Sequence, residues 1–327
     1  MQAILCREWG TPETLRLEEV AAPALTANGV RIRVAAAAIN FADLLMVAGK
    51  YQEKPAFPFT PGLEIAGTVV EWGDAVQGFA KGQRVMAVVG HGGYAEEAVA
   101  DAAAVFPIPD RLDFAAAAGF PVAYGTSHGA LAWRAALQPG ETLLVHGAAG
   151  GVGLTAVEIG KAMGARVIAT ASTAEKLQLA AAHGADHGIC SRDGDVRARV
   201  KELTDGAGAD VVYDPVGGAL FEASLRATAW GGRILIIGFA SGDVPQIPAN
   251  LLLVKNVAAH GYAWGSYIKQ EPARVRDSFA TLLRWWEEGK LKPHISETLP
   301  LKAAAEAMNL LKTRRATGKV VLTMEST

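Results

Sequence analysis

Cysteine is scarce in this 327-residue chain, which contains only Cys6 and Cys190. Two cysteines cannot build a disulfide framework, and they cannot supply the four thiolates of a structural zinc site. We expect both to be small core residues in a protein that stays in the reducing cytoplasm.

The chain also lacks an excess of charge of one sign, because it has 31 Lys and Arg and 33 Asp and Glu, which gives a net charge of −2. With no long basic run either, the sequence argues against a nucleic-acid partner. No stretch approaches 18 apolar residues without a charge or a break, and the first residues, MQAILCREWG, lack the apolar core of a signal peptide. We therefore expect no membrane span and no export signal.

The length favours two domains, since 327 residues exceed one ordinary core. The first part is β-rich, with short β-branched runs separated by Gly and Pro, and two helical pieces follow around Pro121. The runs are 30–39, 64–73 and 83–89.

From Glu141 onward, apolar runs alternate with helical stretches. Near-continuous apolar strands that alternate with helices predict a parallel sheet covered on both faces. The strands are expected at 142–146, 165–170, 210–214 and 233–238, and the helices at 152–163, 174–183, 194–203 and 218–229.

The last 65 residues do not continue this alternation. They predict helices at 272–288 and 302–313 and a strand at 318–323, which we expect to pack back onto the first domain. The predicted fold class is α/β, with residues 124–262 as the doubly wound domain and residues 1–123 plus 263–327 as the β-rich one.

A glycine-rich turn, HGAAGGVG, runs from His146 to Gly153 between a predicted strand and a predicted helix. Its glycines fall as Gly147-x-x-Gly150-x-x-Gly153, with Gly151 in addition. Glycine allows a sharp turn and a close approach to a pyrophosphate, and the helix start offers free N–H groups to the anion. The strand–turn–helix context predicts a dinucleotide site rather than an ordinary tight turn.

The tip of the next strand indicates which dinucleotide binds. It carries Ser172 and Thr173 with no acid, followed by Lys176, and Arg192 comes after the following strand. A carboxylate here would favour NAD, whereas hydroxyls and cations attract a 2′-phosphate. We therefore predict NADPH (NADP), with the alternative that Lys176 and Arg192 are ordinary surface charges.

Three motifs, GETLLVHGAAGGVG (140–153), INFADLLMVAGKY (39–51) and TPGLEIAGTV (60–69), resemble the NADPH:quinone oxidoreductase branch of the medium-chain dehydrogenase/reductase superfamily. The resemblance extends over essentially the whole chain. It implies a Rossmann domain plus a GroES-like catalytic domain, and a homodimer or homotetramer. Glu158 and Ser191 depart from the Gln and the Tyr that relatives carry.

Zinc-containing members of this superfamily have a Cys near the position of Asn40 and a His in a GHE motif. This chain has Asn40 and then Gly62-Leu63-Glu64, and it has no cysteine cluster. Leucine cannot ligate a metal, so no metal site is expected. His91 has no partner at ligand spacing and is interpreted as a lone surface residue.

The resemblance also implies where the nicotinamide lies, in the cleft between the domains. Asn40 and Tyr51 are the candidate catalytic donors to a substrate oxygen; the alternatives are that Asn40 only caps a turn and that Tyr51 only lines the cleft. Asn40 is also an expected cofactor contact, and the others are Asp43, Thr126, Gly150, Gly151, Val152, Phe239, Ala240, Arg315, Gly318 and Lys319.

Without a metal to act as Lewis acid, hydride transfer suits small-molecule acceptors that delocalise the incoming charge themselves. The sequence therefore predicts a zinc-independent reductase of quinones or activated α,β-unsaturated carbonyls, with a proton taken from solvent. Two alternatives stay open: an enoyl-thioester reductase, and a non-catalytic NADPH-binding redox sensor.

Overall fold

The computed structural model describes residues 1–192 and 194–324, and it divides into two compact units. Unit 1 contains Met1–Val122, Ile268–Arg276 and the residues from Pro293 on; unit 2 contains Ala123–Tyr267 and Asp277–Lys292. This division differs from the expected one at helix α10 (Pro272–Glu287), most of which belongs to unit 2. The reason is packing: Ser278 bonds His128, and the ring of Phe279 meets Trp264.

Unit 2 is built on a six-stranded sheet in the order β10-β9-β8-β11-β12-β13, with all strands parallel. Its central strand buries Leu143, Leu144 and Val145 completely, as the apolar runs predict for a sheet covered on both faces. The strands are β8 (Thr142–Val145), β9 (Arg166–Ala171), β10 (His187–Cys190), β11 (Ala209–Asp214), β12 (Thr228–Ile236) and β13 (Ala258–Gly261).

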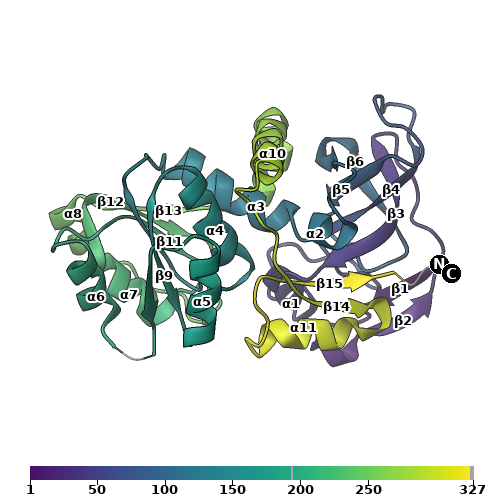
Figure 1. Ribbon diagram of the computed structural model, residues 1–327. Coiled ribbons are helices and arrows are strands. Elements are labelled where there is room, and N and C mark those ends of the chain that lie inside the picture. Colours follow the sequence, from purple (N-terminus) through teal and green to yellow (C-terminus); the bar gives the residue numbers. More distant parts are fainter. Residues whose placement is uncertain (193, 325–327) are drawn as a thin grey trace. The chain divides into compact units, whose positions relative to one another are not determined.

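Helices cover both faces of this sheet (Figure 1). Helices α4 (Gly151–Ala162) and α5 (Ala174–Ala182) lie on one side, and α6 (Val196–Leu203), α7 (Gly218–Ala227) and α8 (Ala249–Lys255) on the other. The chain leaves β8 in one direction for β9 and β10, and later returns to its other side for β11. In such sheets the ligand binds beyond the carboxyl ends of the strands at this reversal.

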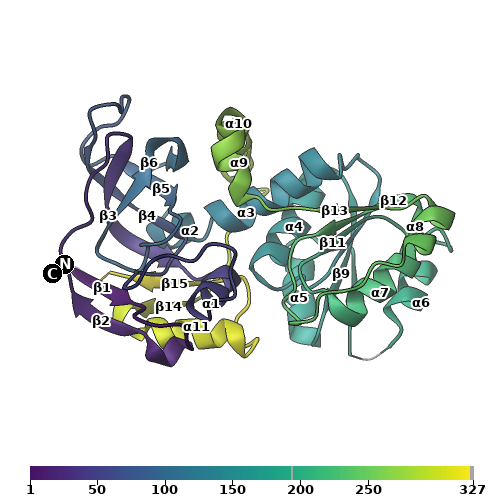
Figure 2. The ribbon, with the colours of Figure 1, turned by 180° about the vertical axis from the view of Figure 1, so that it is seen from behind.

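Unit 1 is a mainly antiparallel sheet in the order β14-β15-β3-β4-β5-β7, with β6 also paired to β3 (Figure 2). Strand β15, near the end of the chain, pairs antiparallel with β3, so the last residues complete a sheet begun by the first. The strands are β3 (Gly29–Ala38), β4 (Glu64–Trp72), β5 (Arg84–Val88), β6 (Glu97–Asp101), β7 (Val105–Pro107), β14 (Ile295–Pro300) and β15 (Lys319–Thr323), beside the pair β1 (Gln2–Leu5) and β2 (Arg16–Glu19).

The remaining helices are short. Helix α1 (Phe41–Val47) was not expected, because its seven residues are too few to show a helical period. The others are α2 (Phe114–Ala118), α3 (Pro121–His128), α9 (Gly265–Gln270) and α11 (Ala304–Lys312), the 3₁₀ turns Pro12–Thr14, Ala102–Ala104 and Leu301–Ala303, and a π-helical segment, Gly129–Arg134.

The predicted α/β fold class, a Rossmann sheet plus a separate β-rich unit, is confirmed. Among the described residues, no helix combines the length and the apolar character that crossing a membrane requires.

Candidate active site

The glycine turn joins β8 to α4 at the carboxyl edge of the unit 2 sheet. Gly147 has a φ of +58°, a conformation that other residues rarely adopt. A Cβ on Gly153 would lie 2.1 Å from the carbonyl oxygen of Gly147, so only glycine lets the helix start this close to the turn. The N–H groups of Gly151, Val152 and Gly153 open the helix without an intrahelical acceptor, and they are available to an anion.

Hydrogen bonds of Ser127 hold the end of helix α3 next to this turn. The Ser127 hydroxyl donates to the carbonyl oxygen of Val152 at 2.9 Å and bonds the Thr155 hydroxyl at 2.8 Å. Its neighbour Thr126 is buried, with 8% of its surface exposed. Thr126 and the glycine turn are therefore held in one rigid part of unit 2.

The expected 2′-phosphate site is assembled from two neighbouring strand ends. Strands β9 and β10 are parallel and pair Ala171 with Cys190, so the residues that follow them lie side by side. Ser172 and Arg192 follow these strands, and Thr173 caps helix α5 by accepting the N–H of Lys176 at 3.4 Å. Arg192 is exposed, while Ser172 and Lys176 are half-buried. Two hydroxyls and two cations therefore stand at this edge.

The loop after β12 begins at the same edge of the sheet. The N–H of Ala240 donates to the carbonyl oxygen of Pro215 at 3.0 Å, which ties this loop to the end of β11. Phe239 is 36% exposed. Both residues therefore lie in a loop that starts at the carboxyl edge of the sheet, and their contact with the nucleotide stays a prediction.

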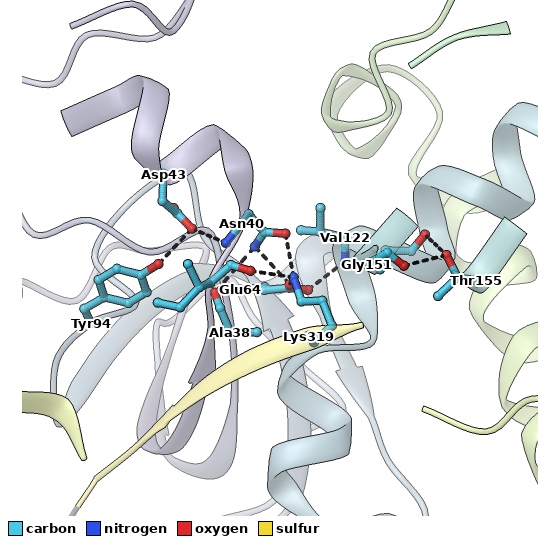
Figure 3. Close-up of polar contacts among 11 residues, drawn as sticks. Ala38, Asn40, Asp43, Glu64, Tyr94, Val122, Gly151, Thr155 and Lys319 are labelled. Carbon is cyan, nitrogen blue, oxygen red and sulfur yellow. Dashed lines mark hydrogen bonds and ion pairs between the residues drawn. The ribbon is translucent and has the colours of Figure 1, made fainter. Parts of the chain in front are cut away.

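In unit 1 the structure brings Asn40, Glu64 and Lys319 together in a buried polar cluster (Figure 3). The Lys319 ammonium donates to Asn40 Oδ1 at 2.7 Å and lies 2.8 Å from Glu64 Oε1. Asn40 Nδ2 donates to the same Glu64 oxygen at 2.9 Å, and the Val122 N–H donates to Glu64 Oε2 at 2.7 Å. The exposed side-chain fraction is 8% for Lys319 and 0% for Glu64, so this ion pair is closed to solvent.

Asp43 lies on the other side of Asn40. Its Oδ2 accepts the backbone N–H of Asn40 at 2.7 Å and the hydroxyl of Tyr94 at 2.8 Å (Figure 3). Its Oδ1 is buried without a partner among the described residues, and burial raises the pKa of Asp43 to about 7. Asp43 therefore anchors the first turn of α1, and with it the position of Asn40.

Three of the expected cofactor contacts also have a structural role inside unit 1. The Lys319 ammonium donates to Asn40 Oδ1 and to the carbonyl oxygen of Ile39, at 2.9 Å, and forms its ion pair with Glu64. Asp43 has no exposed surface. Gly318 has a φ of +52°, and a Cβ there would lie 2.3 Å from the carbonyl oxygen of His294, so its own backbone requires glycine. Of the expected contacts in this segment, Arg315 stays exposed.

Tyr51 follows helix α1 in a half-buried position, and its hydroxyl has no hydrogen bond to any part of the chain that the structure describes. Burial first, and then the charges of Glu53 and Asp43, raise the pKa of its phenol. The phenol therefore keeps its proton near neutral pH and is able to donate it in a hydrogen bond.

Sequence reasoning missed the roles of Glu64 and Tyr94. Glu64 opens the apolar run EIAGTVV, and a carboxylate at the start of a buried strand needs a partner because burying an unpaired charge is costly. That signal was available, but the partner, Lys319, lies 255 positions further along the chain. Tyr94 gave no comparable signal.

Within residues 1–192 and 194–324, no group of three or more His, Cys, Asp or Glu is arranged to hold a metal ion. Leu63, which precedes Glu64, is an apolar core residue, and His91 is exposed. The donors around Asn40 therefore do not fit a zinc ion.

A doubly wound unit with a glycine turn, beside a β-rich unit with a buried polar cluster, defines a two-domain dinucleotide-dependent dehydrogenase. The family model for the alcohol dehydrogenase GroES-like domain matches residues 26–110, and one described as zinc-binding dehydrogenase matches residues 151–287. A quinone oxidoreductase-like protein 2 homolog of Nematostella vectensis is 44% identical over 98% of this chain and 88% of its own.

Solved structures agree with this match. A quinone oxidoreductase of Pseudomonas syringae has a TM-score of 0.92 at 34% identity and covers 98% of this chain and 99% of its own. The quinone oxidoreductase of Escherichia coli, complexed with NADPH, has a TM-score of 0.93 at 30% identity. The match covers 99% of this chain and 100% of that one. The chain belongs to the quinone oxidoreductase branch of the medium-chain dehydrogenase/reductase superfamily, as its motifs indicated.

Proposed function

We propose that this protein is an NADPH-dependent quinone oxidoreductase that reduces quinones or activated enones without a metal ion. The observation that carries the proposal is the set of two hydroxyls and two cations at neighbouring strand ends of the unit with the glycine turn, Ser172, Thr173, Lys176 and Arg192, in a chain whose relatives are named quinone oxidoreductases. The Escherichia coli relative was solved with NADPH.

Unit 2 holds the cofactor in this proposal. The N–H groups of Gly151 and Val152 bind the pyrophosphate at the positive end of α4. Lys176 and Arg192 bind the 2′-phosphate as charge-assisted donors, together with the hydroxyl of Ser172. Glu175, which precedes Lys176, is exposed, and its carboxylate accepts a hydrogen bond from the Thr173 side chain.

Unit 1 supplies hydrogen-bond donors to the acceptor's oxygen. Bound NADPH supplies the hydride, and the negative charge that follows develops on a quinone or enone oxygen. Asn40 Nδ2 is a donor whose orientation is fixed before the reaction, which is the condition for stabilising such a charge, and the Tyr51 hydroxyl is the second donor. Neither carries a metal's Lewis acidity, so the acceptor must delocalise charge by itself.

We also propose that the protein works on small molecules in the cytoplasm as a homodimer or homotetramer. The two free cysteines suit a reducing compartment. Light scattering during size-exclusion chromatography measures the subunit number.

The function is tested by NADPH oxidation with a panel of quinones, enones and enoyl thioesters. Turnover of quinones or enones with NADPH, and weaker turnover with NADH, is the expected result. Turnover of thioesters alone would favour an enoyl-thioester reductase. Tight NADPH binding with no turnover of any acceptor would favour a redox sensor.

A further inference from the structure

The ammonium of Lys319 is engaged inside unit 1. It donates to the carbonyl oxygen of Ile39 at 2.9 Å and to Asn40 Oδ1 at 2.7 Å, and it forms an ion pair with Glu64 Oε1 at 2.8 Å. Only 8% of its side chain is exposed. The direct contacts of this cation therefore include the side chain of Asn40, through which it can act on a substrate.

The two charges allow the Asn40 amide only one orientation. Oδ1 faces the ammonium, and Nδ2 faces the Glu64 carboxylate at 2.9 Å. A flipped amide would place N–H groups against the ammonium and its oxygen against the carboxylate, and both contacts are repulsive. The direction of the amide N–H groups is thus set by Lys319 and Glu64 together (Figure 3).

One amide hydrogen remains for another acceptor. Nδ2 carries two hydrogens, and Glu64 takes one of them at 2.9 Å. For the other, the hydrogen bonds of residues 1–192 and 194–324 include one acceptor, the carbonyl oxygen of Ala38 at 3.5 Å, which is longer than a normal hydrogen bond. This second N–H is the one that a substrate oxygen can use.

The cation also strengthens that donor. A hydrogen bond from an ammonium to an amide oxygen draws electron density from the amide, and linked hydrogen bonds polarise one another in a medium of low dielectric constant. Glu64 is balanced by the Val122 N–H as well as by Lys319. The stem of Lys319 is held against Gly119, where a Cβ would lie 3.1 Å from its Cγ, so the ammonium is fixed in place.

We infer that Lys319 is a positioning residue of this reductase, which orients and polarises the Asn40 amide toward the substrate oxygen. This inference rests on the proposed function. It assigns Lys319 a role in stabilising the developing charge, in place of the expected contact with the cofactor.

The test compares Lys319→Met, Asn40→Ala and the double variant in NADPH-dependent turnover. Lys81→Met, an exposed position in the same unit, is the matched control. Removing one donor to a developing oxyanion costs about 10²–10³ in kcat. Misorienting it in Lys319→Met should therefore reduce kcat by roughly 10- to 100-fold for enones, and less for benzoquinones of high potential, which need less stabilisation.

Two readouts separate positioning from a general structural defect. In the Asn40→Ala background, Lys319→Met should cause no further loss of kcat. The NADPH dissociation constant of Lys319→Met should differ from that of the wild type by less than about 2-fold, because the phosphate and pyrophosphate groups bind to unit 2 in the proposed function. Losses that multiply in the double variant, or that are equal for every acceptor, would overturn the inference.

If Lys319→Met does not fold, Glu64→Gln/Lys319→Met removes both charges, and the same comparisons are made in that background. The proposed function and the inference fail in different ways. Wild-type protein that oxidises no NADPH with any acceptor refutes the function. Wild-type turnover with independent effects of Lys319 and Asn40 refutes only the inference.

Discussion

Replacing Lys176 by Ala tests the proposed 2′-phosphate site. One hydrogen bond between a cation and a phosphate contributes about 1.5–3 kcal/mol. Because about 1.4 kcal/mol is a factor of ten in affinity, the dissociation constant for NADPH should rise roughly 10- to 140-fold. The affinity for NADH should change by less than about 2-fold, since NADH has no phosphate at that position.

The measurement is the quenching or calorimetric titration of each variant with NADPH and NADH at fixed ionic strength. Arg166→Ala is the control, because it removes the same charge from an exposed residue at the opposite end of β9. Five residue steps of about 3.3 Å separate the strand's ends, or about 17 Å, and at that distance physiological salt screens the charge.

Two outcomes would refute the reasoning. An equal loss of affinity for NADPH and NADH would mean that Lys176 supports the site without contacting the phosphate. An equal effect of Lys176→Ala and Arg166→Ala would mean that only net charge matters. Arg192→Ala, from the neighbouring strand end, should reproduce the NADPH-selective loss.

Four further predictions concern the turn, the buried cluster and the metal. Gly153→Ala should abolish detectable NADPH binding, since its Cβ would lie 2.1 Å from the Gly147 oxygen; normal binding in a titration would contradict the turn's role. Glu64→Gln should lower the melting temperature by roughly 6–20 °C, because leaving a buried charge unpaired costs about 3–5 kcal/mol and each kcal/mol shifts the melting temperature by about 2–4 °C. Adding Lys319→Met should recover most of the lost melting temperature. A further fall in the double variant would argue against the pairing of Glu64 with Lys319. The pKa of Asp43 is about 7 in the fold, against an ordinary value of 3.8, so the folded state holds a proton that the unfolded chain has released. Stability should therefore fall as pH rises from about 4 to about 7, and Asp43→Asn should flatten that slope in urea titrations. Added zinc or a chelator should leave turnover unchanged, and metal-dependent turnover would overturn the proposed mechanism.

Much of unit 2 was predictable because its signals are local. Buried parallel strands produce apolar runs such as 142–146, and the spacing of the glycines within eight residues predicts the sharp turn before the helix. Strand β13, with the sequence AAHG, and helix α8 were not predicted. Neither carries a period of its own, since the strand is short and α8 buries none of its residues completely.

The polar cluster of unit 1 could not be predicted in the same way. Its members come from α1, β4 and β15, and only the pairing of β15 with β3 brings Lys319 to Asn40. The family resemblance implied that Lys319, which directly follows the segment RRATG, contacts the cofactor. The folded sheet turns that side chain inward, where its partners are a carboxylate and an amide.

The two units therefore respond differently to substitution. In unit 2 the pyrophosphate is offered backbone N–H groups, and side chains such as Ser191 can vary because no single one completes the site. In unit 1 the Lys319 ammonium and both oxygens of Glu64 have partners, so changing either residue alone leaves a buried group without its partner. Variation at Lys319 should consequently be tolerated only together with a change at Glu64, whereas the phosphate site can adjust one residue at a time.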